Sequence, residues 1–168
     1  GDADSNVIIG VGAGTGGSAA LAKCVVIGSN AFNSTVNAAH TGTIAIGYNA
    51  LTAISSGAPN LAIGYEALKL LETGANNIAI GYAAMDACDG TEEQNIAIGN
   101  NALGAMDEGG GACNDNIAIG QNASISGTAA AFSGNIAIGT NALTSTGGND
   151  LTGTVAIGYL ALTATTSG

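Results

Sequence analysis

Asn77-Ile78-Ala79-Ile80-Gly81 is the stretch around which the whole chain is organised, because near copies of it recur along almost all of the sequence. The pentapeptide returns unchanged at 95–99, 116–120 and 135–139, and five variants bring the copies to nine. Their glycines lie 17 to 21 residues apart, at Gly10, Gly28, Gly47, Gly64, Gly81, Gly99, Gly120, Gly139 and Gly158. A short period sustained over a whole chain predicts one structural unit stacked on itself.

Each copy alternates in the way expected of a β-strand. Ile78 and Ile80 share one face, and Asn77, Ala79 and Gly81 share the other. Three residues after the glycine there is an alanine in all nine copies, and the next residue is large and apolar in seven. Polar spacers rich in turn residues then take up the variation in length. We therefore predict two short strands per coil, stacked in parallel.

Composition agrees with a folded repeat domain. The 168 residues are 46% hydrophobic and 8% charged, and 28 are glycine. A disordered chain would be polar or highly charged instead. We predict an all-β fold, a parallel β-solenoid (β-roll) of about nine coils of 17–21 residues. Residues 1–5 would be a lead-in and residues 6–168 a single repeat domain.

The net charge of -10, with only two lysines and no arginine, limits the partners of this chain. A phosphate backbone requires a cationic surface, so nucleic-acid binding is excluded and anionic membrane surfaces are disfavoured. No apolar run approaches the roughly 18 residues that a membrane helix needs, so no membrane insertion is expected.

The two faces of the repeated strand predict different roles. The isoleucine face is expected to fill the inside of the coil. The small face allows another backbone to approach closely, either the far wall of the same coil or another chain. We predict an interface along this column, formed by Ala45, Ala62, Ala79, Ala97, Ala118, Ala137 and Ala156.

The asparagines at the first position of the repeat either stack into a hydrogen-bonded ladder or each cap their own turn. We favour the ladder. Its predicted members are Asn6, Asn60, Asn77, Asn95, Asn116 and Asn135.

The motif resembles known fibre repeats. The Asn-x-Ala-Ile-Gly core, followed at a fixed distance by Ala, is similar to head repeats of trimeric autotransporter adhesins. The extended form at residues 43–51, which begins with Thr43 and ends with Ala50-Leu51, also resembles repeats of bacteriophage tail fibres. The resemblance covers residues 6–162, although the period here is longer than in the adhesin heads. It implies a left-handed β-roll, a homotrimer, and a place in an extracellular, cell-surface or virion fibre that contacts a host or surface.

No catalytic set is visible, and no enzymatic activity is expected. His40 is the only histidine and is predicted to lie in a surface loop, without the nucleophile and orienting partner that catalysis needs. Acidic residues gather in two successive spacers between 86 and 115. They are interpreted as a solvated acidic face or, alternatively, as calcium ligands, with the candidates Asp86, Asp89, Asp107 and Glu108. No other cofactor is expected.

Tyrosines and cysteines are the other side chains of interest. All four tyrosines follow a repeat glycine, and Tyr48, Tyr65 and Tyr82 fall on consecutive coils. They are expected to form a stacked column, which would either stiffen a flank of the solenoid or form a ligand stripe for a surface glycan.

A disulfide between Cys88 and Cys113 is predicted from their adjacent spacers, and Cys24 is expected to be buried in the asparagine column.

These observations predict a structural and adhesive fibre segment. The homotrimer is the favoured assembly, and an end-to-end filament of single solenoids is the second. Ice binding is the alternative from another class. It calls for a flat column of threonines, whereas the residues after the repeat glycines read Val, Ser, Tyr, Tyr, Tyr, Asn, Gln, Thr and Tyr. A polysaccharide-cleaving spike would need carboxylates in a groove, for which the acidic spacers are the only candidates.

Overall fold

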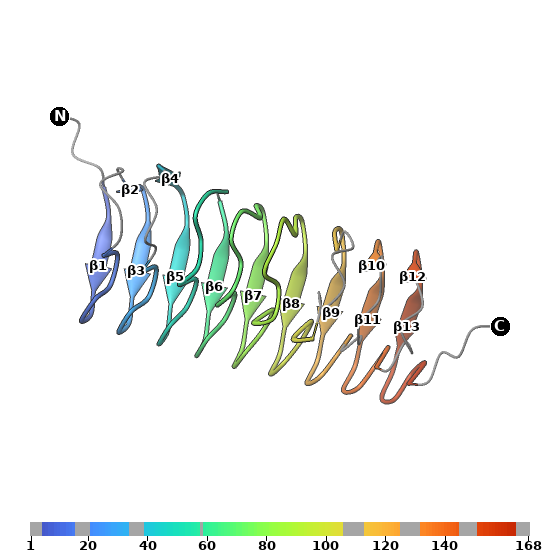
Figure 1. Ribbon diagram of the computed structural model, residues 1–168. Helices are drawn as coiled ribbons and strands as arrows, with labels where there is room; N and C mark the ends of the chain where they lie inside the picture. The colour runs from blue at the N-terminus through green and yellow to red at the C-terminus, as the bar shows by residue number, and fades with distance from the viewer. Residues whose placement is uncertain are drawn as a thin grey trace.

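The computed structural model of the chain is an all-β solenoid in which one strand from each repeat joins the same parallel sheet. The strands lie side by side in a row, and the first and last strands of the chain lie at opposite ends of that row (Figure 1). Within the described residues there is no helix, and so none that could cross a bilayer. Residues 1–4 of the predicted lead-in fall outside the described ranges, which are 5–15, 21–33, 39–57, 59–105, 113–124, 132–144 and 151–163.

The main sheet has nine strands of three residues each, paired in parallel and without a shift in register. Ala79 lies opposite Ala62 on one side and opposite Ala97 on the other. In order across the sheet, the strands are β1 (Val7–Ile9), β3 (Val25–Ile27), β5 (Ile44–Ile46), β6 (Leu61–Ile63), β7 (Ile78–Ile80), β8 (Ile96–Ile98), β9 (Ile117–Ile119), β11 (Ile136–Ile138) and β13 (Val155–Ile157). Two further pairs of two-residue strands precede main strands: β2 (Leu21–Ala22) with β4 (His40–Thr41), and β10 (Phe132–Ser133) with β12 (Leu151–Thr152).

The segment after the repeat glycine is a turn, so the prediction of a second strand there is wrong. In the coil that begins with β5, Asn49 and Leu51 both have positive φ angles, 54° and 55°. The same alternation recurs in the coil of β8, at Asn101 (53°) and Leu103 (50°). Left-handed residues reverse the chain direction and cannot continue a strand. No β-branched residue occupies either position in any copy, in keeping with the steric cost of that conformation.

The repeat glycine is required by both conformation and space. Gly81 has a φ of 142°, and a Cβ at this position would overlap the carbonyl oxygen of Gly99 in the next coil. The backbones of successive coils are therefore in direct contact at this corner. Any side chain here would push two coils apart, which explains the glycine in every repeat.

The alanine face of the strand, and not the isoleucine face, points into the coil. Ala45, Ala62, Ala79, Ala97, Ala118 and Ala137 are all 0% exposed, and Ala156 is 2% exposed. The isoleucines on either side of each alanine are half-buried or exposed. The prediction that isoleucine fills the interior is thus wrong. The predicted intermolecular interface along the alanine column is wrong as well, because the far wall of the same coil already covers it.

The turn explains why alanine lies inside. The large residue at its left-handed position enters the same interior, and Leu51, Leu68, Met85, Leu103 and Leu143 are all 0% exposed. Ile54 and Leu71 add further bulk from the spacers and are also 0% exposed. A close-packed interior that receives these side chains from one wall leaves room for only small residues on the opposite strand.

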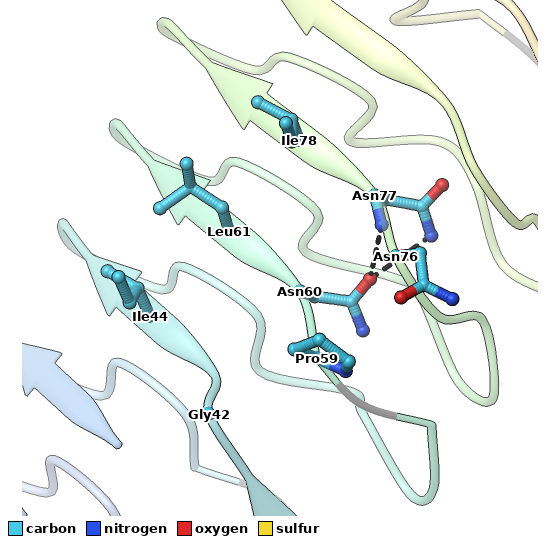
Figure 2. Close-up of a pocket in the computed structure, with 8 residues that line it drawn as sticks. All are labelled: Gly42, Ile44, Pro59, Asn60, Leu61, Asn76, Asn77 and Ile78. Carbon is cyan, nitrogen blue, oxygen red and sulfur yellow. Dashed lines mark hydrogen bonds between the residues drawn. The ribbon is translucent and has the colours of Figure 1, made fainter. Parts of the chain in front are cut away.

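An asparagine ladder runs inside the coils over five consecutive repeats. Asn60 Oδ1 accepts hydrogen bonds from the backbone N–H of Asn77 at 2.9 Å and from its Nδ2 at 3.2 Å (Figure 2). Asn77 Nδ2 also donates to the Glu92 carbonyl at 2.6 Å. The same two-way pattern continues through Asn95, Asn116 and Asn135. Both donors and the acceptor of each amide are satisfied, which offsets the cost of burying these polar groups.

Candidate interaction surface

The outer side of the nine-stranded sheet carries two columns of aliphatic residues, which we call the outer isoleucine face. One column is isoleucine in all nine repeats: Ile9, Ile27, Ile46, Ile63, Ile80, Ile98, Ile119, Ile138 and Ile157. The other is aliphatic throughout: Val7, Val25, Ile44, Leu61, Ile78, Ile96, Ile117, Ile136 and Val155. The face therefore contains no charged or polar side chain along the whole length of the sheet.

These aliphatic side chains are only partly covered by their neighbours. Ile98 and Ile119, in the interior of the sheet, are each 37% exposed. At the ends of the sheet, Ile9 is 58% and Ile157 is 66% exposed. Soluble proteins rarely leave a contiguous apolar surface of this extent in water unless something binds to it.

A shallow groove of about 280 Å³ borders this face at strands β5, β6 and β7. Ile44, Leu61 and Ile78 form a column along it, and Pro59 and Asn76 stand on neighbouring coils at its other side (Figure 2). Gly42 occupies the same repeat position as Pro59 and Asn76 but has no side chain. The groove is thus an extension of the outer isoleucine face, and its lining is mainly apolar.

Tyr48, Tyr65 and Tyr82 form a stacked column, which we call the tyrosine stack, at the downstream end of the same three strands. The ring centroids of Tyr48 and Tyr65 lie 5.2 Å apart with 20° between the planes. Those of Tyr65 and Tyr82 lie 5.1 Å apart with 6° between the planes. The three side chains are 43 to 53% exposed.

Stacking limits what the tyrosine stack can offer to a glycan. A sugar ring binds an aromatic side chain by lying against its face. In the stack, the faces between neighbouring rings are already in contact with each other. Only the outward face of Tyr48 and that of Tyr82 remain, and the rest of the column presents ring edges and hydroxyl groups. The geometry therefore suits mutual stiffening better than a continuous glycan stripe.

Charged side chains lie close to the middle of the stack. The Glu66 carboxylate raises the pKa of Tyr65 by electrostatic repulsion of the phenolate. Partial burial works to raise the pKa of Glu66 itself, but hydrogen bonds with Lys69 and Asn49 outweigh it and lower the pKa. Lys69 Nζ lies 3.2 Å from Glu66 Oε2, and Asn49 Nδ2 donates to Glu66 Oε1 at 3.4 Å. Glu66 is thus a carboxylate held in its charged form beside Tyr65 by Lys69 and Asn49.

The asparagine ladder is interrupted at Cys24 and Thr43, and this interruption lies beside His40. The prediction that His40 is in a surface loop is wrong, because the side chain is 1% exposed and packs edge-on against Phe32 with ring centroids 4.9 Å apart. Neither imidazole nitrogen makes a hydrogen bond of good geometry to the part of the chain that the structure describes. Burial lowers the pKa of His40, and the backbone of Gly57 partly opposes that shift.

The cysteines do not form the predicted disulfide. Cys88 and Cys113 are both buried thiols, and they occupy different positions in the repeat. Cys88 follows Ile54 and Leu71 at successive intervals of 17 residues, whereas Cys113 lies three residues before a ladder asparagine. Cys24 is 0% exposed at a ladder position, where its Sγ lies 3.4 Å from the Ala22 carbonyl oxygen.

The acidic spacers are only partly described. Asp107 and Glu108, two of the four candidate calcium ligands, lie outside the described residues. Burial raises the pKa of Asp86, and backbone hydrogen bonds partly offset this. Glu92 is 3% exposed and accepts a hydrogen bond from the Gly90 N–H at 3.1 Å, so it does not belong to a solvated acidic face. No group of three or more potential metal ligands occurs among the described residues.

A second asparagine ladder was missed by the sequence analysis. Asn101 Nδ2 donates to Asn122 Oδ1 at 3.3 Å, and Asn122 Nδ2 donates to Asn141 Oδ1 at 3.2 Å. These residues occupy the first left-handed position of the turn, with φ between 53° and 56°. The recurrence of asparagine two residues after the glycine was the available signal, since asparagine tolerates this conformation better than most residues.

No protein-family model, curated protein or solved structure matches this chain.

Proposed function

We propose that this chain is a structural and adhesive segment of an extracellular or virion fibre, in which copies associate laterally through the outer isoleucine face. The observation that carries the proposal is the unbroken aliphatic surface of eighteen side chains on one side of the sheet. An isolated chain would leave this surface in water, whereas association of several copies would bury it at a favourable free energy roughly proportional to its area.

The regularity of the face favours identical partners. The strands pair in register, so each column runs parallel to the solenoid axis. Copies aligned side by side can therefore match isoleucine columns along their whole length, and closed symmetry would leave no copy with an open face. The resemblance to trimeric fibre repeats supports three copies. The interface we propose is the isoleucine face, in place of the buried alanine column.

Native mass and one pair of substitutions test this assembly. We expect the wild type to sediment at three times the chain mass of 16.0 kDa. Ile80→Lys with Ile98→Lys places two charges on the outer isoleucine face and should give monomers that retain the β-type circular dichroism spectrum. Thr73→Lys with Thr91→Lys adds the same charge at exposed spacer positions and should leave the assembly intact.

Two results would contradict lateral assembly. One is a wild type that stays at 16.0 kDa over a wide range of concentrations. The other is a mass that grows without limit and is unaffected by the lysine pair on the face, which is the behaviour of end-to-end stacking. The adhesive role is tested separately, by measuring binding of the labelled assembly to immobilised bacterial and host surface polysaccharides.

A further inference from the structure

The tyrosine stack places three oxidisable phenols in a fixed row on the surface. The backbone fixes the row, because Glu66 N–H donates to the Tyr48 carbonyl at 2.9 Å and Ala83 N–H donates to the Tyr65 carbonyl at 2.9 Å. The rings lie 5.1 to 5.2 Å apart between centroids and are nearly parallel. Tyr159, by contrast, is 74% exposed and follows a coil with Thr140 at the corresponding position, so it has no ring beside it on that side.

We propose that the tyrosine stack is a site of oxidative cross-linking, at which a one-electron oxidant such as a haem peroxidase with hydrogen peroxide joins Tyr65 to Tyr48 or to Tyr82 as dityrosine. This inference does not depend on lateral assembly. It assigns a covalent modification to the exposed aromatic column, and its product would staple adjacent coils of the solenoid.

The chemistry balances with hydrogen peroxide as the terminal oxidant. Each of two phenols gives up one electron and its hydroxyl proton to become a tyrosyl radical. The two radicals form a carbon–carbon bond between ring carbons ortho to the oxygens, and each ring then moves its ortho hydrogen to its oxygen and regains aromaticity. One hydrogen peroxide molecule accepts the two electrons and two protons and becomes two water molecules.

Three features of the site favour this reaction. Proximity raises the effective concentration of one ring around the other far above that of two rings in solution. The 43 to 53% exposure of the three tyrosines gives an oxidant access to the rings. The Glu66 carboxylate beside Tyr65 can accept the proton that the phenol loses as it is oxidised.

The central position of Tyr65 in the stack allows a test with two matched control variants. It is the only member with a ring on both sides, so Tyr65→Phe removes both neighbouring pairs, whereas Tyr48→Phe and Tyr82→Phe each leave one. All three variants lose one hydroxyl group and keep the stacked rings, so their folding should be equal by circular dichroism. The full-length protein is treated with a haem peroxidase and hydrogen peroxide, and dityrosine is measured by fluorescence and peptide mass spectrometry.

We expect wild type, Tyr48→Phe and Tyr82→Phe to yield dityrosine, and Tyr65→Phe to yield on the order of tenfold less, as the loss of proximity predicts. The cross-linked peptides should have lost two hydrogen atoms. In a mixture of ¹⁵N-labelled and unlabelled protein, they should be fully labelled or fully unlabelled. Equal yields from Tyr65→Phe and Tyr48→Phe would overturn the proposal, as would cross-links that mainly join labelled to unlabelled chains or involve Tyr159.

Discussion

Asn95 Oδ1 accepts two hydrogen bonds from Asn116, one from the backbone N–H and one from the side-chain Nδ2, both at 3.0 Å. The two residues are 0% and 1% exposed. One side chain therefore connects two coils through both the backbone and the side chain of the next. The strands contribute only three residues each to the sheet, so this second line of hydrogen bonds fixes their register.

Removing one member from the middle of this ladder should be costly. Asn95→Ala deletes the acceptor for the Asn116 backbone N–H and the donor to the Cys113 carbonyl. Each buried group left unsatisfied costs about 1–3 kcal/mol, so we expect a loss of at least about 2 kcal/mol in the free energy of unfolding in urea. Asn6→Ala is the control: it also removes the acceptor of the Cys24 N–H and the donor to the Leu21 carbonyl, but Asn6 is half-buried in the first coil, where water can replace part of these bonds, so a smaller loss is expected. Equal losses for the two variants would contradict a cooperative ladder.

Two of the repeat glycines allow the cost of backbone strain to be measured separately from the cost of steric overlap between coils. Gly81 and Gly158 have similar φ angles, 142° and 129°. A Cβ at Gly81 would collide with Gly99, whereas among the described residues beyond its two chain neighbours the nearest atom to a Cβ at Gly158 is 4.0 Å away. We expect Gly158→Ala to show only the backbone strain, about 1–3 kcal/mol, and Gly81→Ala to lose considerably more or fail to fold. Thermal denaturation of the two variants measures the difference, and equal stabilities would refute the close contact between coils.

The period and register of this fold were predictable, but the direction of its faces was not. Alternation along residues such as Ile78, Ala79 and Ile80 shows that a strand has two faces and does not say which one is inside. The answer depends on how the turn closes the coil, and its left-handed residues send Leu68 and Leu103 inward. A hydrophobic pattern does not reveal left-handed residues. From the pattern alone, the same segment is predicted to be an extended apolar strand.

Only part of the candidate interaction surface was predictable from the sequence. The tyrosine stack follows from the position of each tyrosine after a repeat glycine. The outer isoleucine face does not, because apolar residues are expected to be buried and here they lie outside. His40 is the only histidine, and a single residue shows no periodic pattern that would indicate its direction. Aligned with Leu21, Phe132 and Leu151, which occupy the same repeat position, it belongs to an inward column.

The inward direction of the alanine face and the outward direction of the isoleucine face lead to a further prediction. Ala97→Leu would place extra methylene groups into a close-packed interior, and overpacking of this kind costs about 1–3 kcal/mol or more. Ile98→Leu, on the outer face one residue later, should change the free energy of unfolding much less. Urea denaturation of both variants measures this. A tolerated Ala97→Leu would mean that the alanine column faces outward after all.

His40 makes the stability of the first coils depend on pH. Burial lowers its pKa in the folded chain below the unfolded value of about 6.5, so protons bind the unfolded chain more tightly. Stability is then fully present above pH 6.5 and is lost as the pH falls, by at most about 1.4 kcal/mol per pH unit from this one group. His40→Leu copies the residue at the same position in the preceding coil, where Leu21 pairs with His40 across the β2–β4 strands, and should fold normally.

The test records melting curves of the wild type and of His40→Leu at pH 7.5 and at pH 5.0. The carboxylates titrate in both proteins, so the difference between the two losses of stability is due to the histidine. We expect the wild type to lose more stability on acidification than His40→Leu, and identical losses would show that the imidazole is hydrated or paired in solution.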